Sequence, residues 1–261
     1  MFEVGRQPKI PSGREVLYGI HPVREALVAG RRRINGLMVD RPAPSGRQAD
    51  IVELASRRQI AWQTRTPEQM RQLTGSDQHQ GIAATVSPLP IDSVEAIVDA
   101  RMAVGGDCLL VLLDRIVDPH NLGAVVRSAH CAGADALVIT KDRAAGATPT
   151  VSKASAGALE HTRLCRVTNL AKTIGWLKKK GVWAAGLAME ADRTIYQADF
   201  KGALALVIGG EEKGLRPLVR QSCDYLVSIP LRGRVDSLNA STATAVALYE
   251  ALRQRQVEPS A

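Results

Sequence analysis

Aromatic residues are scarce in this chain of 261 residues, because Phe, Trp and Tyr together account for only 3% of it. Domains that hold single-stranded nucleic acid by stacking its bases, such as RRM and OB folds, depend on exposed rings. An aromatic stacking platform is therefore disfavoured. If the chain binds a nucleic acid, we expect contacts to phosphates and recognition of shape to dominate.

The chain also lacks the common nucleotide-binding motifs. No G-x-G-x-x-G occurs in it, and the glycine-rich segment 208–215 (IGGEEKGL) continues with Arg216. A Walker loop needs Lys and then Ser or Thr directly after its last glycine, where Leu215 and Arg216 stand here. Bound NAD and ATP are disfavoured. Taken alone, segment 208–215 is also consistent with a plain turn between a strand and a helix.

Cysteine and histidine show no pattern of a metal site or a disulfide framework. The four cysteines form no C-x-x-C pair, and the five histidines are dispersed. We therefore expect no metal, and we expect reduced thiols in a cytoplasmic protein, buried where the surroundings are apolar. No apolar run is long enough to span a bilayer, so no membrane association is expected. The cysteines are Cys108, Cys131, Cys165 and Cys223.

Positive charge is abundant. The chain has 34 Lys and Arg against 26 Asp and Glu, a net charge of +8, and an isoelectric point of about 9.6. Such an excess favours a polyanionic partner, because cations that neutralise phosphates release counterions. A solvated basic surface is the alternative. The run Arg31–Arg33 is equally consistent with a phosphate grip and with a solvated turn.

Composition divides the chain into four parts. Residues 1–14 are basic and rich in Gly and Pro, as in a flexible tail. Residues 15–87 alternate between short strands and helices, which predicts a small α/β unit. The segment 88–107 opens with Ser-Pro-Leu-Pro and is expected to be a linker holding one short helix near 93–102. Residues 108–261 form a second α/β domain.

Strands alternate with helices throughout the second domain. Apolar runs at 108–113, 136–140, 182–188 and 203–208 predict strands, and helices are expected at 122–132, near 150–158, at 170–180 and at about 240–255. This order predicts a mostly parallel sheet with both faces covered. Another apolar run, 225–230, ends like 203–208 in a polar turn before a helix. Two such strand ends form a crevice in which α/β proteins bind ligands.

Two polar residues follow the first of these strands. Asn121 opens the helix and is most simply its N-cap, whereas Arg127 is most simply a solvated helix residue. The apolar residues of this helix fall on one face, away from Arg127. That face consists of Leu122, Val125, Val126 and Ala129.

Three segments considered together point to a known family. DPHNLGAVVRSA (118–129), IGGEEKGL (208–215) and IPLRGRVDSLNAS (229–241) resemble, in this order, the three motifs of the SpoU family. These are RNA ribose 2′-O-methyltransferases of the SPOUT class. YGIHPVREAL (18–27) and QGIAATV (80–86) are similar to the substrate-binding domain of family members that methylate a guanosine in bacterial 23S rRNA.

The resemblance implies a specific fold and cofactor. It implies a catalytic SPOUT domain whose C-terminal segment is threaded into a deep trefoil knot, and a small N-terminal RNA-binding domain similar to a ribosomal protein. It also implies a homodimer with a shared active site, to which the small residues of the last helix contribute. The methyl donor would be S-adenosylmethionine, bound in a bent form at Gly209, Gly214, Ile229 and Leu238.

The family's catalytic roles fall on five residues, namely Asn121, Arg127, Glu211, Ser237 and Asn239. Arg127 would polarise the ribose hydroxyl, and we expect Glu211 and Asn239 to orient Arg127 and the loops. An alternative role for Ser237 and Asn239 is to cap the last helix. The expected reaction is methylation of a guanosine ribose in 23S rRNA. A tRNA or another rRNA position as substrate, or a non-enzymatic RNA-binding protein, remain alternatives.

Overall fold

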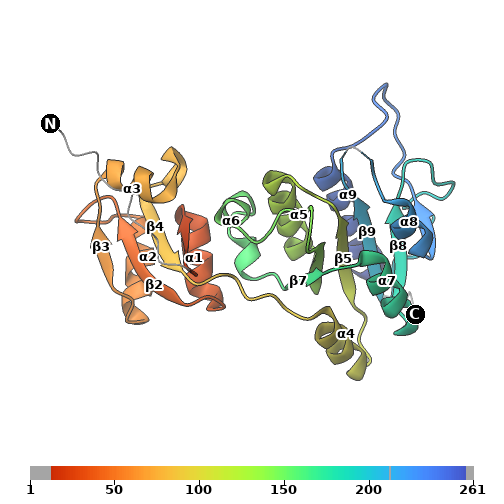
Figure 1. Ribbon diagram of the computed structural model, residues 1–261, viewed down its shortest axis with the longest axis horizontal. Coiled ribbons are helices and arrows are strands. Elements are labelled where there is room, and N and C mark those ends of the chain that lie inside the picture. Colours follow the sequence, from red (N-terminus) through yellow and green to blue (C-terminus); the bar gives the residue numbers. More distant parts are fainter. Residues whose placement is uncertain (1–12, 212, 257–261) are drawn as a thin grey trace. The chain divides into compact units, whose positions relative to one another are not determined.

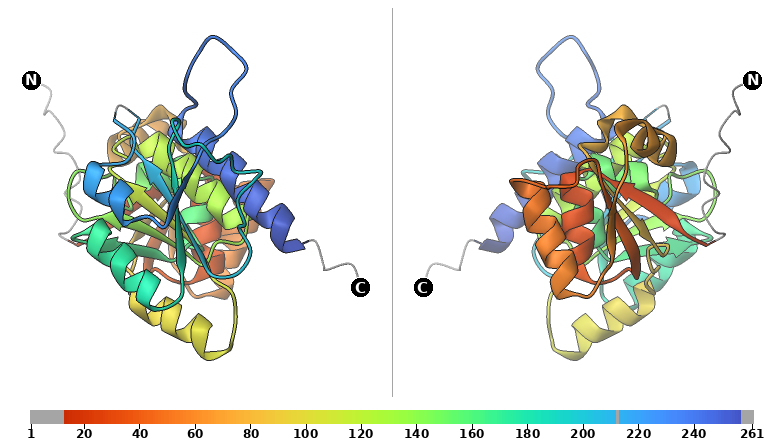
Figure 2. Two further views of the ribbon diagram at one scale, coloured as in Figure 1. Left: turned by 90° about the vertical axis from the view of Figure 1, so that its right-hand side faces the viewer. Right: turned by 90° about the vertical axis from the view of Figure 1, so that its left-hand side faces the viewer.

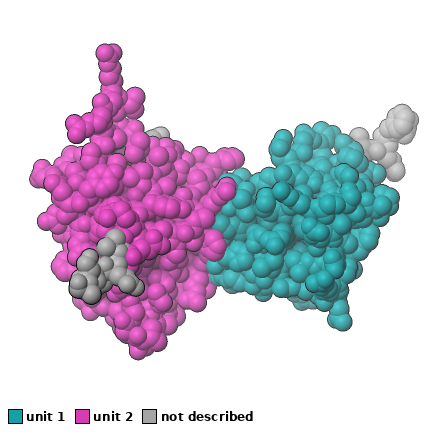
Figure 3. Space-filling view, turned by 180° about the vertical axis from the view of Figure 1, so that it is seen from behind, with its two compact units in different colours: residues 1–90, 147–161 teal, residues 91–146, 162–261 magenta. Residues whose placement is uncertain are grey.

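The computed structural model describes residues 13–211 and 213–256, so the tail expected at 1–14 lies almost entirely outside the described residues. The chain forms two compact units, which Figure 3 shows in different colours. Unit 1 comprises residues 1–90 and 147–161, and unit 2 comprises residues 91–146 and 162–261. Each unit has its own sheet and its own core.

Unit 1 is built on a mixed sheet of four strands in the order β1-β4-β2-β3. β4 pairs antiparallel with both β1 and β2, whereas β3 pairs parallel with β2 at the edge. The strands are β1 (Glu15–Tyr18), β2 (Ile34–Val39), β3 (Trp62–Thr64) and β4 (Ile82–Val86).

Helices cover both faces of this sheet. Leu17, Leu37 and Ile82 pack with α1 and α2 in one apolar cluster. Met38 and Met70 belong to a second cluster on the other face, under α3. The helices are α1 (Ile20–Ala29), α2 (Arg47–Arg57) and α3 (Pro67–Thr74), followed by the 3-10 turn η1 (Asp77–His79). Thr66 and Gln69 form a reciprocal capping box at the start of α3.

The segment 147–161 completes unit 1 although it lies far along the chain. It holds α6 (Pro149–Ala154) and the 3-10 turn η2 (Ala158–Glu160). Arg32 is buried and binds Glu160 through Nε at 2.8 Å, and it also binds Glu15. The Arg31–Arg33 run is therefore neither a phosphate grip nor a solvated turn at its central residue. Arg32 instead connects two distant stretches of the chain.

Unit 2 contains a six-stranded sheet in the order β10-β8-β9-β5-β6-β7, in which every pairing is parallel. The central strand β5 is buried along its whole length, as expected for a strand covered on both faces. This confirms the predicted parallel sheet. The strands are β5 (Leu109–Asp114), β6 (Ala136–Thr140), β7 (Leu164–Val167), β8 (Trp183–Leu187), β9 (Leu204–Gly209) and β10 (Tyr225–Val227).

The helices of unit 2 form a layer on each face of its sheet (Figure 1, Figure 2). Leu110 and Leu112 point to the face where α4, α7 and α8 complete one apolar cluster. Alternate residues such as Val111 point to the opposite face, where α9 packs against α5 and β9. The helices are α4 (Val94–Ala103), α5 (Pro119–Cys131), α7 (Leu170–Lys179), α8 (Pro217–Ser222) and α9 (Ala240–Gln256).

The predicted domain boundaries stay a prediction, but two segments are placed differently by the compact units. α4 lies in the stretch expected as a linker, 88–107, and buries Val94, Ile97 and Val98 in the core of unit 2. The segment 147–161, expected within the second domain, belongs to unit 1. The trefoil knot that the family resemblance implies also remains a prediction.

Candidate active site

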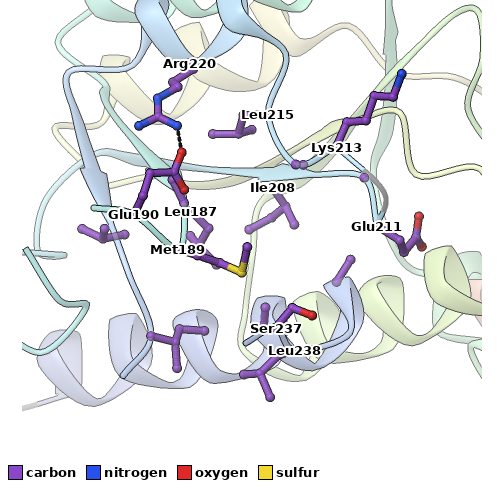
Figure 4. Close-up of a pocket in the computed structure, with 18 of the residues that line it drawn as sticks. Leu187, Met189, Glu190, Ile208, Glu211, Lys213, Leu215, Arg220, Ser237 and Leu238 are labelled. Atoms are coloured by element: carbon purple, nitrogen blue, oxygen red, sulfur yellow. Dashed lines mark ion pairs between the residues drawn. The ribbon is translucent and has the colours of Figure 1, made fainter. Parts of the chain in front are cut away.

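A pocket of about 410 Å³ opens beyond the carboxyl ends of β8, β9 and β10 (Figure 4). Its position follows from the parallel sheet, because the loops after neighbouring strands diverge at that edge. All four residues predicted to hold a cofactor line it, together with Glu211 and Ser237. The four are Gly209, Gly214, Ile229 and Leu238.

The loop after β9 folds back on itself so tightly that it requires glycine. Gly210 and Gly214 form an isolated antiparallel bridge, with the Gly214 N–H donating to the Gly210 carbonyl at 3.0 Å. A Cβ atom on Gly209 would lie 2.1 Å from the carbonyl carbon of Gly214, and one on Gly210 would lie 2.7 Å from the Arg115 carbonyl oxygen. Backbone therefore forms this wall of the pocket.

A buried carboxylate anchors the far end of the same loop. Asp114, at the end of β5, accepts hydrogen bonds from the Arg216 backbone N–H at 2.9 Å and from Arg216 Nε at 2.7 Å. Its side chain is fully buried, and Arg216 provides the counter-charge that such a carboxylate needs. The loop thus lies against Arg115, directly after β5, at Gly210 and is hydrogen-bonded to the end of β5 at Arg216.

Three of the predicted catalytic residues come together at the rim of the pocket. Asn121 Nδ2 donates to Glu211 Oε1 at 2.5 Å, and Asn239 Nδ2 donates to Asn121 Oδ1 at 3.0 Å. These residues lie at the start of α5, in the loop after β9 and at the start of α9. We expected Glu211 and Asn239 to orient Arg127, but both are connected to Asn121 instead.

The helix caps differ from the simplest sequence interpretation. Asp118 caps α5 by accepting from the His120 N–H at 2.9 Å, so Asn121 is not the N-cap. Asn239 does cap α9, since its Oδ1 accepts from the Ser241 N–H at 2.8 Å. No hydrogen bond of Ser237 to α9 occurs within the described residues. Asn239 therefore both caps α9 and belongs to the amide cluster, which consists of Asn121, Glu211 and Asn239.

Arg127 lies apart from this cluster. It is exposed on α5, on the side away from the buried residues Leu122, Val125, Val126 and Ala129, whose common face was predicted correctly. Within residues 13–211 and 213–256, its guanidinium forms neither a hydrogen bond nor an ion pair. It is therefore available to a partner of the chain.

Sequence reasoning missed the wall of the pocket that follows β8. Leu187, Ala188, Met189 and Glu190 line this wall, and Glu190 forms an ion pair with Arg220 of α8 across it (Figure 4). The available signal was the end of the apolar run 182–188, which reaches the same sheet edge as 203–208 and 225–230. A helix was expected after the turn at 208–215, but nothing in its sequence indicates that Arg220 reaches this wall.

The thiols do not contribute to this site. Cys108 and Cys165 are buried as expected, whereas Cys131 is exposed and Cys223 is half-buried. Burial raises the pKa of the Cys108 thiol to about 11 and that of Cys223 to about 12. Among the residues that the structure describes, no group of three or more His, Cys, Asp or Glu is placed to hold a metal ion. No helix in the described part of the chain has the length and apolarity to cross a membrane.

Residues 108–249 match the model of the SpoU rRNA Methylase family, and residues 16–91 match a model described as RNA 2'-O ribose methyltransferase substrate binding. The chain belongs to the SpoU rRNA methylase family. This confirms the resemblance carried by the three motifs. The family match spans the whole pocket and the amide cluster.

Individual relatives cover nearly the whole chain. A protein of Ralstonia nicotianae named 23S rRNA (guanosine-2'-O-)-methyltransferase RlmB is 40% identical over 250 residues, which are 95% of this chain and 99% of that protein. A protein of Shewanella oneidensis with the same name is 42% identical over 243 residues, covering 93% of this chain and 98% of that one.

A solved structure supports the fold. The SpoU methyltransferase AviRb from Streptomyces viridochromogenes, in complex with the cofactor AdoMet, superposes with a TM-score of 0.78 at 28% identity. The match covers 93% of this chain and 91% of AviRb. The α/β SPOUT architecture predicted from the sequence is thereby confirmed.

Proposed function

We propose that this chain methylates the ribose 2′-hydroxyl of a guanosine in 23S rRNA, with S-adenosylmethionine as the donor. The observation that carries the proposal is the cluster of Asn121, Glu211 and Asn239 at the rim of a pocket made by three strand ends. The names of the relatives from Ralstonia and Shewanella, which match along almost the whole chain, support the choice of rRNA and guanosine.

The pocket suits the proposed cofactor in size and in its walls. A volume of about 410 Å³ lies in the range of small-molecule sites, and the walls are mostly apolar side chains and backbone. The Cβ positions of Gly209 and Gly210 are occupied by the backbone of Gly214 and Arg115, so this wall presents backbone groups to a ligand. Backbone amides and carbonyls at Gly209, Ile229 and Leu238 would hold the adenosine and methionine parts.

When bound, S-adenosylmethionine supplies an already activated methyl group on a sulfonium, so no metal is required for the transfer. The residues of the chain must then place the ribose oxygen in line with the methyl carbon, at about 3 Å. Asn121, held between Glu211 and Asn239, fixes the rim at which this oxygen arrives.

Arg127 would stabilise the negative charge that develops on the ribose oxygen. Its planar group of donors can bind that oxygen and a neighbouring phosphate together. It does not act as the base, because a guanidinium group stays protonated in proteins. We assign the proton to solvent or to an RNA phosphate. The guanidinium of Arg127 is free within the described part of the chain and lies on α5 away from Asn121, Glu211 and Asn239. This position supports a role in contacting the RNA.

We also propose that the chain acts as a homodimer in the cytoplasm. Val246 is only partly buried on α9, next to the fully buried Ala247 and Ala251, so it remains available for a second copy. A shared site would let Arg127 of one copy act at the pocket of the other. Light scattering at micromolar concentration tests this, and a monomer would remove the dimer from the proposal.

The activity is tested with purified protein, S-adenosylmethionine and unmethylated 23S rRNA transcribed in vitro. Nucleosides are analysed by mass spectrometry after digestion. The proposal expects 2′-O-methylguanosine in the rRNA and no methylation of a tRNA transcript. Methylation of the tRNA alone would reassign the substrate. Failure of titration calorimetry to detect S-adenosylmethionine binding at tens of micromolar, with RNA present, would indicate a non-enzymatic RNA-binding protein.

A further inference from the structure

The loop between β10 and α9 has one part in the pocket and one part in solvent. Every residue of 230–239 is exposed, and the loop projects from the body of unit 2 in both ribbon figures (Figure 1, Figure 2). Leu231 on one side of the loop, and Ser237 and Leu238 on the other, line the pocket. The residues between them, 232–236, extend beyond the pocket wall.

Two arginines occupy this projecting part. Arg232 and Arg234 form no ion pair and no side-chain hydrogen bond within the described residues, and Asp236 is the only acidic residue of 230–239. Lys213, on the neighbouring loop, also lines the pocket and is exposed without an ion pair among the described residues. By contrast, Arg216 and Arg220 near the same loops are both paired with carboxylates.

Unpaired guanidinium groups in solvent contribute nothing to folding, but they match phosphate in charge and in geometry. Any RNA whose ribose reaches the rim at Asn121 must bring its own phosphates past the loops that border the pocket. A projecting loop with two free arginines is suited to hold them. Phosphate contacts of this kind set the register of a nucleic acid without reading its sequence.

We propose that Arg232 and Arg234 bind phosphates of the substrate RNA next to the target nucleotide, and so hold the RNA strand over the pocket. This inference rests on the proposed function and names a further RNA-binding surface for the same site. Its role is in binding the RNA, whereas the pocket side of the loop binds the cofactor. Removing the charges of Arg232 and Arg234 should therefore weaken RNA binding and leave cofactor binding unchanged.

The test is the double variant Arg232→Gln/Arg234→Gln, with unmodified 23S rRNA transcribed in vitro as the probe. Loss of two phosphate contacts makes the negative slope of log K against log salt shallower by about 1.4, and it weakens RNA binding by about tenfold at 0.15 M salt. The KM for RNA should rise with little change in kcat. The Kd for S-adenosylmethionine, measured by calorimetry, should stay the same, which also shows that the pocket is folded.

A matched control removes two charges from the opposite edge of the same sheet. Lys179 ends α7 before β8, and Lys201 precedes β9, so both exposed lysines lie at the amino ends of the strands. Lys179→Gln/Lys201→Gln should leave the salt slope and the KM for RNA unchanged. Arg232→Lys/Arg234→Lys should restore the slope, because lysine keeps the charge.

Several results would overturn the inference. An unchanged salt slope and RNA affinity in the double variant, with an active wild-type enzyme, would overturn it while leaving the proposed function intact. Conversion of a dimer to a monomer by the double variant would assign the loop to a second copy of the chain. Absence of both RNA binding and methylation in the wild type would overturn the proposed function and this inference together.

Discussion

Asn239 uses the two ends of one amide for two different tasks. Its Oδ1 caps α9 through the Ser241 N–H, and its Nδ2 donates to Asn121 at the pocket rim. A substitution can therefore remove one task and keep the other. Serine is a good N-cap but has no second donor long enough to replace the amide.

We predict that Asn239→Ala and Asn239→Ser differ in stability but not in activity. The alanine variant should lose about 1 kcal/mol of unfolding free energy with the cap, whereas the serine variant should remain within a few tenths of the wild type. Both should show a reduced kcat. Chemical denaturation and a single-turnover methylation assay measure the two effects. Wild-type activity of the serine variant would show that the bond to Asn121 is irrelevant to the reaction.

Arg127 is tested by a change that keeps its charge. Arg127→Lys removes the planar group of donors, and loss of a donor to a developing negative charge typically lowers kcat by about 10²-fold. The assay is single-turnover methylation of 23S rRNA, with RNA affinity measured in parallel. Nearly full activity with unchanged RNA affinity would mean that the geometry of the guanidinium does not matter.

The four thiols should differ in reactivity according to their burial. Cys108 and Cys223 have pKa values raised to about 11 and about 12, so both are protonated at pH 8, and Cys131 is the exposed one. Iodoacetamide at pH 8, followed by peptide mass spectrometry, should label Cys131 first in the folded protein. Equal labelling of Cys108 would contradict its place in the core.

At the scale of elements, the loop after β9 is defined by how closely it packs on itself. Gly209→Ala would place a methyl group 2.1 Å from the Gly214 carbonyl carbon, so the loop must move. We predict a loss of about 1–3 kcal/mol in stability. If moving this wall reduces the binding free energy of the cofactor by about 1.4 kcal/mol, the affinity of the protein for the cofactor falls about tenfold. Calorimetry with S-adenosylmethionine measures this change.

Gly175 provides the matched control for that substitution. It lies in the middle of α7, and beyond its chain neighbours and the backbone of its own helix no heavy atom lies within 4 Å of the position that its Cβ would take. Gly175→Ala should stabilise the protein by up to about 1 kcal/mol and leave the cofactor affinity unchanged. Equal cofactor binding by both alanine variants would show that the tight turn at Gly209 does not shape the pocket.

Most elements of this fold could be predicted from periodicity, but two short strands could not. The predicted strand 136–140 matches β6, and Leu122, Val125, Val126 and Ala129 form the buried face of α5. The strands β1 and β7 were missed because each has only four residues, too few to establish a period. Their formation depends on pairing and packing with distant segments, which a local pattern does not contain.

The location of the pocket could be predicted from the sequence, but its hydrogen bonds could be predicted only in part. The family motifs located Gly209, Gly214, Ile229 and Leu238, all of which line it. The link from Asn121 to Glu211 joins residues 90 positions apart, and the link from Asp114 to Arg216 joins residues 102 positions apart. Such pairs depend on the order of the strands in the sheet.

At the scale of the whole molecule, unit 1 requires a segment from far along the chain. Glu160 is buried and receives Arg32 Nε at 2.8 Å, Arg32 Nη2 at 3.1 Å and Ser152 Oγ at 2.7 Å. Glu25 in α1 binds His161 at 2.8 Å. The three bonds to Glu160 satisfy a carboxylate that would otherwise destabilise the folded state.

We predict that Arg32→Met destabilises unit 1 by about 3–5 kcal/mol, because it leaves Glu160 charged and unpaired in the interior. Arg32→Met/Glu160→Met should recover much of this loss, since both charges are then removed. Hydrogen exchange followed by mass spectrometry on the full chain should show faster exchange in residues 15–90 and 147–161. Unchanged exchange there in Arg32→Met would mean that the buried pair does not hold the segment.

The proposed reaction places one methyl group on one RNA, and mapping ribose methylation along rRNA from cells with and without the gene detects that methyl directly. The account predicts the loss of 2′-O-methylation at a guanosine of 23S rRNA when the gene is deleted. It also predicts restoration of that methyl by the wild-type gene but not by one carrying Asn121→Ala. An unchanged 23S rRNA methylation pattern in the deletion strain would contradict the account.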